Sequence, residues 1–229
     1  CLHDSRANHR GGRRLFHLGM RRPLIIGHRG FAGRYPENTL DAVQAAVAVG
    51  ADGVEVDVRP CREGVWVCHH DRTRKGKPLR EWPLAALRQE KVPSLAEVVE
   101  AVPEDRFLFV EVKPLAQSEL LRLLDPLQRL LQPRKHLKVL SSSLRVLSLV
   151  QTVLPRATVS WVVDRVPSFL PPGLELSPHH LFVEELRGFH VPLNPWTVNQ
   201  KARMRDLAAL GVASLTTNFP DRALEVLGA

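Results

Sequence analysis

The stretch LIIGHRGFAGRYPENTLDAVQAAVAVGADGVEVDV, from Leu24 to Val58, indicates how this chain of 229 residues folds. Its apolar start, Leu24–His28, predicts a strand, and the Gly- and Pro-containing loop GFAGRYPE follows. Asn38 is expected to cap a helix whose apolar residues recur at helical spacing until Gly50. A second predicted strand, Gly53–Val58, begins directly afterwards. Strand, helix and strand in succession form a βαβ unit, which favours a parallel sheet.

The same alternation of strands and helices continues to the end of the chain. Further helices are predicted at Ser94–Val102, with Ser94 as the cap, at Gln117–Leu131 and at Lys201–Leu210. Six more strands are predicted at Phe107–Val112, Leu137–Ser141, Thr158–Val163, Leu174–Ser177, Val191–Val198 and Val212–Thr217. Eight strands are the number that closes a (β/α) barrel. The expected fold class is therefore α/β, a TIM-like (β/α)8 barrel, and it forms one domain over residues 23–229 because the sequence shows no repeat or linker.

A β-hairpin is expected to extend the second strand, because the apolar run Val65–Cys68 follows it after a short break. If Glu63-Gly64 forms a two-residue loop with the glycine at positive φ, the register places His70 directly opposite Asp57. His69 would then face the other way. A short insertion follows the hairpin.

The three cysteines, Cys1, Cys61 and Cys68, do not form a disulfide framework. The hairpin register sets Cys61 and Cys68 diagonally, which is poor geometry for a disulfide, so buried or rim thiols are favoured over a metal site. The sequence contains neither a signal-peptide core nor an apolar run of the ~20 residues that a membrane span needs. A reduced, cytoplasmic protein without integral membrane association is expected.

The net charge of +8 is concentrated at the start of the chain, where residues 1–22 carry six arginines against Asp4 and so contribute +5. We expect this basic arm to be disordered or accessory. Because the rest of the chain carries only +3, nucleic acid is not an expected partner. The alternative of another class is a non-enzymatic nucleic-acid binder that would act through the arm with steep salt dependence.

Acidic and basic side chains recur near the carboxyl ends of the predicted strands, where the active sites of barrels lie. Side chains two apart share one face of a strand, as the acids of VEVDV and the Glu and Lys of FLFVEVKP do. Three carboxylates are hard oxygen ligands suited to Ca²⁺ or Mg²⁺, and an Arg and a Lys can hold a phosphate oxyanion. Two histidines form an acid–base pair near neutral pH. The converging set is Glu55, Asp57, Glu111, His28, His70, Arg29 and Lys113.

Together these segments resemble the glycerophosphodiester phosphodiesterase family. The similar stretches are GHRGFAGRYPENTLDAVQAAVAVGADGVEVDV, His70-Asp71, VPSLAEVV, FVEVKP, PWTVN and GVASLTTNFPD, in the family's order across residues 24–221. The resemblance implies a TIM-like barrel and a phosphoric diester hydrolase that uses a divalent cation, Ca²⁺ or Mg²⁺, with Mn²⁺ as a further option. Its substrate would be a small glycerophosphodiester, and its products glycerol 3-phosphate and an alcohol.

The resemblance also implies roles for individual residues. The metal ligands would be Glu55, Asp57 and Glu111, with His28 as general base and His70 as general acid. Arg29 and Lys113 would bind the phosphate, and Glu37 and Trp196 would border the pocket. The implied reaction is attack of the glycerol 2-hydroxyl on phosphorus, which gives a cyclic phosphate that water then opens.

The chain departs from the family's pattern at two places that bear on the site. Only 21 residues separate Asp71 from Pro93, where the family usually carries a longer insertion that roofs part of the mouth. The family's late Thr-Asp-x-Pro motif is replaced by Thr217-Asn218-Phe219-Pro220. The short stretch between Asp71 and Pro93 concerns the lid and the specificity.

Other interpretations of the same residues stay open at this point. Lys113 fits a structural ion pair with Glu111, Trp196 fits a core position, and Asn38 fits a helix cap. Within enzymes, the alternative activity is that of a lysophospholipase D or a phospholipase C-like lipid phosphodiesterase. The sequence does not indicate the head group, the preferred metal or the oligomeric state.

Overall fold

The computed structural model describes residues 22–228. Of the basic arm predicted at residues 1–22, only Arg22 falls within this range, and Cys1 lies outside it. Over the described range, no helix is both long enough and apolar enough to cross a membrane.

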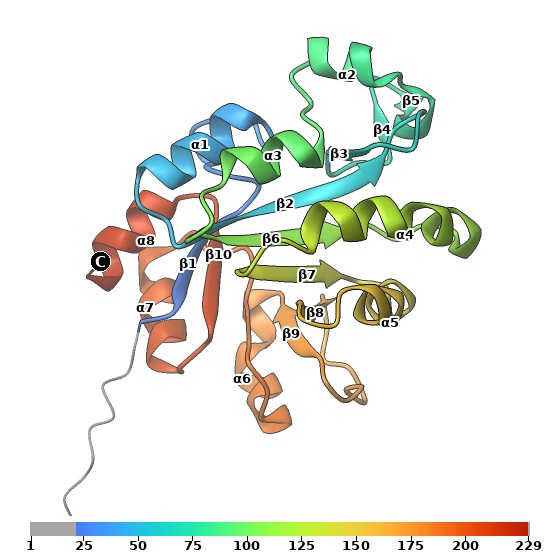
Figure 1. Cartoon of the computed structure of the whole chain (residues 1–229). Coiled ribbons are helices and arrows are strands. Elements are labelled where there is room, and N and C mark those ends of the chain that lie inside the picture. The colour runs from blue at the N-terminus through green and yellow to red at the C-terminus, as the bar shows by residue number, and fades with distance from the viewer. Residues whose placement is uncertain (1–21, 229) are drawn as a thin grey trace, which may run out of the picture.

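The centre of the molecule is a curled parallel sheet with helices on its outer side (Figure 1). Its strands are β1 (Leu24–Gly27), β2 (Gly53–Pro60), β6 (Phe107–Val112), β7 (Leu137–Ser141), β8 (Thr158–Val163), β9 (Glu175–Pro178) and β10 (Ser214–Thr217). They pair in the order β10-β1-β2-β6-β7-β8-β9, each neighbour parallel to the next. The principal helices are α1 (Leu40–Ala48), α3 (Leu95–Ala101), α4 (Gln117–Leu131), α5 (Leu144–Val153), α7 (Lys201–Ala209) and α8 (Pro220–Leu227). This arrangement confirms the predicted TIM-like barrel.

The segment 191–198 closes the barrel between β9 and β10, but it is not the regular strand that the sequence predicts. Pro192 and Pro195 have no N–H group, so the segment cannot form a continuous ladder. The segment still forms backbone hydrogen bonds with both neighbouring strands. On the β9 side, Asn194 N–H donates to the carbonyl of Leu176 at 2.8 Å, and on the β10 side, Thr216 N–H donates to the carbonyl of Pro195 at 3.0 Å. The eighth position of the barrel is therefore filled by irregular backbone.

Alternation along β2 and β6 divides apolar from acidic side chains. The valines of β2, Val54, Val56 and Val58, belong to the core between the sheet and the outer helices. Glu55 and Asp57 occupy the alternate positions and so face the barrel interior. Phe109 of β6 lies beside Glu55 in the register and packs inside the barrel with Ile26 and Leu140. The valine pattern thus anchors the strand while the interior receives the charges.

The hairpin after β2 has a register one residue away from the predicted one. Strand β3 (Trp66–Cys68) pairs antiparallel with β2, and Cys68 lies opposite Val58. The loop has three residues, because Gly64 N–H donates to the Cys61 carbonyl at 3.0 Å and Cys61 N–H donates to the Val65 carbonyl at 2.9 Å. Gly64 has φ +77°, as a three-residue loop requires.

One consequence of this register is that the residue opposite Asp57 is His69 and not His70. The backbone N–H of His69 donates to the carbonyl of Asp57 at 2.9 Å. The prediction of a two-residue loop was therefore wrong. The ladder ends at Cys68, so the direction of His70 depends on the chain beyond the hairpin and not on strand alternation.

The short insertion after the hairpin builds a small satellite layer beside β2 and β3 (Figure 1). It comprises β4 (Thr73–Arg74), β5 (Lys77–Pro78), η1 (Leu79–Glu81) and α2 (Leu84–Gln89). Its apolar cluster contains Leu79 and Leu87 together with Cys61 of the hairpin. Cys61 and Cys68 are both buried free thiols, as expected.

The remaining short helices follow β9 and are η2 (His180–Phe182), α6 (Val183–Leu186) and η3 (Arg187–Phe189). They take the place of a full crossover helix before the closing segment. The capping of α3 is as predicted, because Ser94 forms a reciprocal capping box with Glu97.

Candidate active site

Three carboxylates meet at the carboxyl ends of β2 and β6. Asp57 lies directly beside Glu111 in the parallel register, and Glu55 lies two residues earlier on the same face. Glu55 is 3% exposed and Asp57 is 1% exposed. One oxygen from each of the three groups lies within 4.8 Å of the others. The structure thus brings together the three predicted metal ligands.

Two cations lie against these acids. The Lys113 ammonium is 2.6 Å from Asp57 Oδ1 and 2.6 Å from Glu111 Oε1. Arg29 Nε is 3.0 Å from Asp57 Oδ2, and another nitrogen of Arg29 donates to Glu37 at 2.7 Å. The ion pair between Lys113 and Glu111 that the sequence left open is therefore present, and Asp57 shares it.

The three carboxyl groups have different protonation behaviour, although they are close together. Burial, with repulsion from Asp57 and Glu111, raises the pKa of Glu55 well above its ordinary value. Burial alone would raise the pKa of Asp57 too, but Lys113 and Arg29 outweigh it and lower that pKa to about 2. The pKa of Glu111 is raised, mainly by burial. Asp57 is thus the carboxylate whose negative charge the fold itself stabilises.

Asn38 holds Asp57 in place and is not the helix cap that the sequence predicts. Its Nδ2 group donates to Asp57 Oδ2 at 3.0 Å, and its Oδ1 accepts the backbone N–H of Asp57 at 3.0 Å. The cap of α1 is Thr39, whose hydroxyl accepts from Ala42 N–H. Asn38 adopts φ 57°, a left-handed conformation that Asn tolerates better than most residues.

The turn after β1 carries His28 and Arg29 to the same cavity. Arg29 has φ 53°, and its backbone N–H donates to Glu55 Oε2 at 3.0 Å. Gly30 follows at φ +81°, and a Cβ there would lie 2.5 Å from the backbone of Ala42. Only glycine lets this turn pack against the start of α1. The close contact between Gly30 and α1 therefore fixes the position of Arg29.

The ring of His28 is hydrogen-bonded to Asn218, at the end of β10. The His28 Nδ1 to Asn218 Oδ1 distance is 2.7 Å. Because an amide oxygen only accepts, Nδ1 carries the proton and Nε2 has a free lone pair. Burial and the charge of Arg29 lower the pKa of His28 to about 4, so the ring is neutral near pH 7.

His70 reaches the cavity from the segment that follows the hairpin. Its Nδ1 lies 2.8 Å from Asp71 Oδ1, so that nitrogen donates to the carboxylate and fixes the ring. Arg59 Nε donates to the backbone carbonyl of His70 at 2.8 Å and holds the segment from β2. The ring of His69 points elsewhere, with Nε2 3.4 Å from the Thr73 carbonyl.

These side chains line one small cavity of about 90 Å³. Of the nine predicted site residues, seven line it, namely His28, Arg29, Glu55, His70, Glu111, Lys113 and Trp196. Asp57 is buried against Lys113 and Arg29. Glu37 is bound to Arg29 with its side chain 49% exposed. Trp196 is positioned by a hydrogen bond from its Nε1 to the Ser177 carbonyl at 2.8 Å and by an edge contact with His179.

Sequence reasoning missed several residues of this site. Asn218 stood in a motif that differed from the family's pattern, and that difference was the signal for its partnership with His28. Asn38 was found but assigned to a helix cap. The cavity also includes Leu140, Val162 and Asn194, which no motif marks, and Thr216, which lies in the stretch GVASLTTNFPD but was given no role. Their place depends on how the strands close around the barrel.

The carboxylate cluster fits a divalent cation. Glu55 Oε1 is buried and has no hydrogen-bond partner, and a buried polar oxygen without a partner is costly. Three carboxylates provide the hard oxygen donors that Ca²⁺ and Mg²⁺ require. The donor set and the unpartnered oxygen both agree with a cation held by Glu55, Asp57 and Glu111.

Comparison with known proteins agrees with the family resemblance of the sequence. The family model described as the glycerophosphoryl diester phosphodiesterase family matches residues 28–122, which begin directly after β1 and include α1, β2, the hairpin, the insertion and β6. A glycerophosphodiester phosphodiesterase of Bacillus altitudinis is 26% identical over 239 residues, covering 88% of this chain and 97% of that protein. One from Caldanaerobacter subterraneus is 26% identical, covering 89% of this chain and 97% of the relative.

Solved structures show the same fold at lower identity. An Oleispira antarctica phosphodiesterase, in complex with the product sn-glycerol-3-phosphate, superposes with a TM-score of 0.80 at 21% identity and covers 91% of this chain and 98% of its own. The glycerophosphodiester phosphodiesterase of Thermotoga maritima has a TM-score of 0.76 at 22% identity, with coverage of 90% and 99% respectively.

Proposed function

The chain belongs to the glycerophosphoryl diester phosphodiesterase family, and from that premise we propose that it hydrolyses glycerophosphodiesters to glycerol 3-phosphate and an alcohol. It is a phosphoric diester hydrolase. The observation that carries the proposal is the meeting of three carboxylates, two cationic side chains and two histidines around one cavity. The product held by the Oleispira antarctica neighbour supports the assignment of the substrate class.

The proposed phosphate site consists of Arg29 and Lys113. Both cations lie at the cavity and both contact Asp57, which orients them. Burial opposes the charge of Lys113, but Asp57 and Glu111 outweigh it and raise its pKa, so the ammonium stays charged. Glu55, Asp57 and Glu111 would hold the divalent cation. When bound, the cation would supply Lewis-acid polarisation of a phosphate oxygen and neutralise developing charge.

His28 is the proposed general base. Asn218 keeps the Nδ1 proton in place, so the Nε2 lone pair can accept the proton of the glycerol 2-hydroxyl as its oxygen attacks phosphorus. The lowered pKa of about 4 keeps this nitrogen unprotonated across the neutral range. The attack would give a cyclic phosphate of glycerol and release the alcohol.

His70 is the proposed general acid. Its contact with Asp71 fixes the ring, and Nε2 can donate a proton to the leaving alkoxide. In the second half of the reaction, water would open the cyclic phosphate. His70 would then act as the base toward water, and His28 would return its proton to the 2-oxygen.

The proposal is tested by measuring glycerol 3-phosphate release from a panel of glycerophosphodiesters in EDTA, Mg²⁺, Ca²⁺ and Mn²⁺. We expect release with at least one cation and loss of release in EDTA. Deacylated and lysolipid substrates assayed in parallel separate this activity from that of a lysophospholipase D. Absence of glycerol 3-phosphate from every deacylated diester with every cation would contradict the proposed function.

A further inference from the structure

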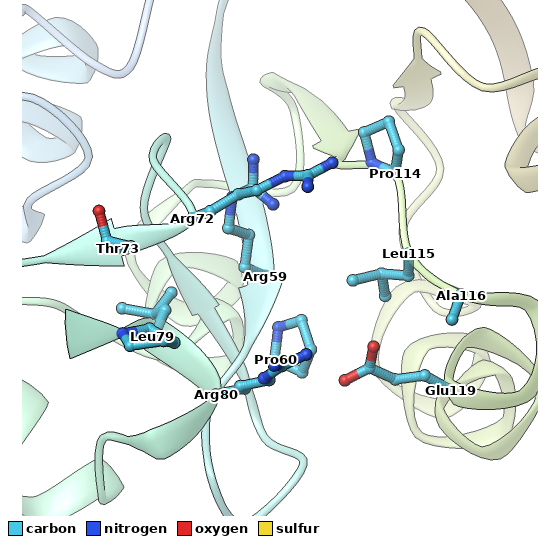
Figure 2. Close-up of a pocket in the computed structure, with 11 residues that line it drawn as sticks. Arg59, Pro60, Arg72, Thr73, Leu79, Arg80, Pro114, Leu115, Ala116 and Glu119 are labelled. Atoms are coloured by element: carbon cyan, nitrogen blue, oxygen red, sulfur yellow. The ribbon is translucent and has the colours of Figure 1, made fainter. Parts of the chain in front are cut away.

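A second, larger cavity lies beside the catalytic one, between the insertion and the segment that follows β6 (Figure 2). It has a volume of about 410 Å³, which is within the range of small-molecule sites. Its basic lining residues are Arg59 of β2, Arg72, which precedes β4, and Arg80 of η1. Pro114 and Glu119 complete the opposite side. We call this space the arginine cavity.

The guanidinium groups of the arginine cavity form no ion pair within the described part of the chain. Among residues 22–228, no carboxylate lies within 4.0 Å of a guanidinium nitrogen of Arg59, Arg72 or Arg80. Several arginines elsewhere form ion pairs, such as Arg34 with Asp221 at 2.6 Å.

The arginine cavity adjoins the residues proposed to act on the leaving alcohol. Arg59 Nε donates to the carbonyl of His70 at 2.8 Å, and Arg72 follows His70 by two residues. On the facing side, Pro114 directly follows Lys113 of the proposed phosphate site. A diester held at Lys113 with its leaving oxygen toward His70 would therefore direct its alcohol group to this cavity.

We propose that the arginine cavity binds a phosphate-like anion carried by the alcohol half of the substrate. The inference rests on the proposed function, because it names the class of diester that the same site would prefer. Guanidinium groups suit such a ligand, since their planar N–H donors match the oxygens of a phosphate monoester. Free inorganic phosphate has the same chemistry, and a phosphate titration distinguishes it from a phosphate group of the substrate.

The matched substrates are glycerophosphoinositol and glycerophosphoinositol 4-phosphate, which differ by one phosphate monoester on the alcohol. We expect the unsubstituted protein to have the higher kcat/KM, measured as glycerol 3-phosphate release, on the phosphorylated substrate. The double variant Arg72→Gln/Arg80→Gln should lower that kcat/KM by about tenfold to a hundredfold, because each lost charge-assisted hydrogen bond is worth roughly tenfold. The kcat/KM for glycerophosphoinositol should change less than about twofold, since neither arginine lies in the catalytic cavity.

The matched control is Arg156→Gln/Arg205→Gln, which removes the same charge at exposed positions outside both cavities. It should leave both kcat/KM values unchanged. Glu119→Gln removes the one carboxylate that lines the arginine cavity. This variant should therefore have a higher ratio of kcat/KM for the phosphorylated substrate to kcat/KM for glycerophosphoinositol.

Calorimetric titration with inositol 4-phosphate gives a readout that needs no turnover. We expect binding to the unsubstituted protein and to the control, and at least tenfold weaker binding to Arg72→Gln/Arg80→Gln, whose melting temperature shows whether it is folded. Equal binding to all three proteins would overturn the inference while leaving the proposed function intact. Failure to release glycerol 3-phosphate from either substrate, with binding still dependent on the arginines, would contradict the proposed function alone.

A titration with inorganic phosphate separates the two sources of the anion. If the anion belongs to the substrate, phosphate should raise the KM for glycerophosphoinositol 4-phosphate at concentrations below those at which its binding at Arg29 and Lys113 inhibits the turnover of both substrates. A phosphate effect on glycerophosphoinositol that disappears in Arg72→Gln/Arg80→Gln, without any preference between the two substrates, would overturn the assignment to the alcohol half.

Discussion

Asn38 and Asp57 exchange two hydrogen bonds of 3.0 Å, one to the carboxylate and one from the backbone N–H. Asn38 is 2% exposed and Asp57 is 1% exposed, so water does not replace either bond. The pair ties the start of α1 to the acidic strand. It therefore fixes the direction of the carboxylate that also contacts Arg29 and Lys113.

The first prediction concerns this pair. Asn38→Gly keeps the left-handed backbone but removes both hydrogen bonds, and we expect a loss of about 1–3 kcal/mol in the free energy of unfolding. The affinity for the divalent cation should fall by about tenfold to a hundredfold, as for other residues that orient a metal ligand. Thr39→Ala is the matched control, because it removes the helix cap at a cost of about 1 kcal/mol and leaves Asp57 held. Equal cation affinities in the two variants, measured by calorimetry, would contradict the positioning role of Asn38.

The second prediction is that Glu55 and Asp57 respond oppositely to neutralisation in chelator. The pKa of Glu55 is raised by burial, so its ionisation costs stability as pH rises from the ordinary value through the folded one. Glu55→Gln should therefore raise the melting temperature at pH 8 more than at pH 5. It should also reduce the further increase that Ca²⁺ or Mg²⁺ produces. A variant that kept the full cation-induced increase would rule out Glu55 as a ligand.

Asp57→Asn should have the opposite effect on stability. The pKa of Asp57 is lowered to about 2 by Lys113 and Arg29 against the effect of burial, so its charge stabilises the fold above the ordinary pKa and this contribution is lost as pH falls toward 2. Asp57→Asn leaves both cations without this buried partner, and we expect a loss of about 3 kcal/mol at pH 7. Urea unfolding of both variants in EDTA tests the difference in sign. Stabilisation by Asp57→Asn would show that the ion pairs do not stabilise the folded state.

The third prediction uses the replacement of the family's aspartate by Asn218. With the pKa of His28 lowered to about 4, the acidic limb of kcat/KM should lie well below pH 6 at saturating cation. Asn218→Asp places a carboxylate on the Nδ1 proton and stabilises the charged ring. The pKa of His28 should rise by about 1–3 units, and the acidic limb should move to higher pH by a similar amount. An unmoved limb in Asn218→Asp would exclude His28 as the group that titrates there.

The fourth prediction separates the roles of the histidines. His70→Ala should lose about 10²–10⁴-fold in rate on a natural diester but much less on a p-nitrophenyl ester of the same glycerol phosphate, because that leaving group needs no proton. His28→Ala should impair both substrates. His69→Ala is the control, since its ring contacts the Thr73 carbonyl outside the catalytic cavity, and it should spare both. Equal losses in His69→Ala and His70→Ala would contradict the assignment of His70.

The fifth prediction concerns the turn that carries Arg29. Gly30→Ala combines a positive φ with a Cβ placed 2.5 Å from the backbone of Ala42, so we expect destabilisation of at least about 2 kcal/mol and weaker substrate binding. Gly76→Ala is the matched control, because its φ is +76° but nothing lies within 4 Å of the added Cβ. It should cost only about 1 kcal/mol. Similar losses in the free energy of unfolding for both variants would show that the close contact between Gly30 and Ala42 does not determine stability.

The hairpin shows where sequence reasoning about the site failed. A two-residue and a three-residue loop are both compatible with CREGV, and the choice shifts every pair in the ladder by one residue. His70 nevertheless lines the catalytic cavity, because the chain leaves the ladder after Cys68. Its placement follows from the contacts with Asp71 and Arg59, which lie beyond the strand pattern.

The sequence by itself determined the barrel and the faces of its acidic strands. Alternation of side chains is a local property of an extended backbone. The valines of β2 therefore lie on the face of the strand opposite to Glu55 and Asp57, whatever the register. The tertiary structure alone decided which groups hold those acids. Asn38 reaches Asp57 from 19 residues away, and Asn218 reaches His28 from 190 residues away. Such contacts depend on how distant turns meet when the sheet closes, and closure is set by packing of the whole chain, which no local spacing encodes.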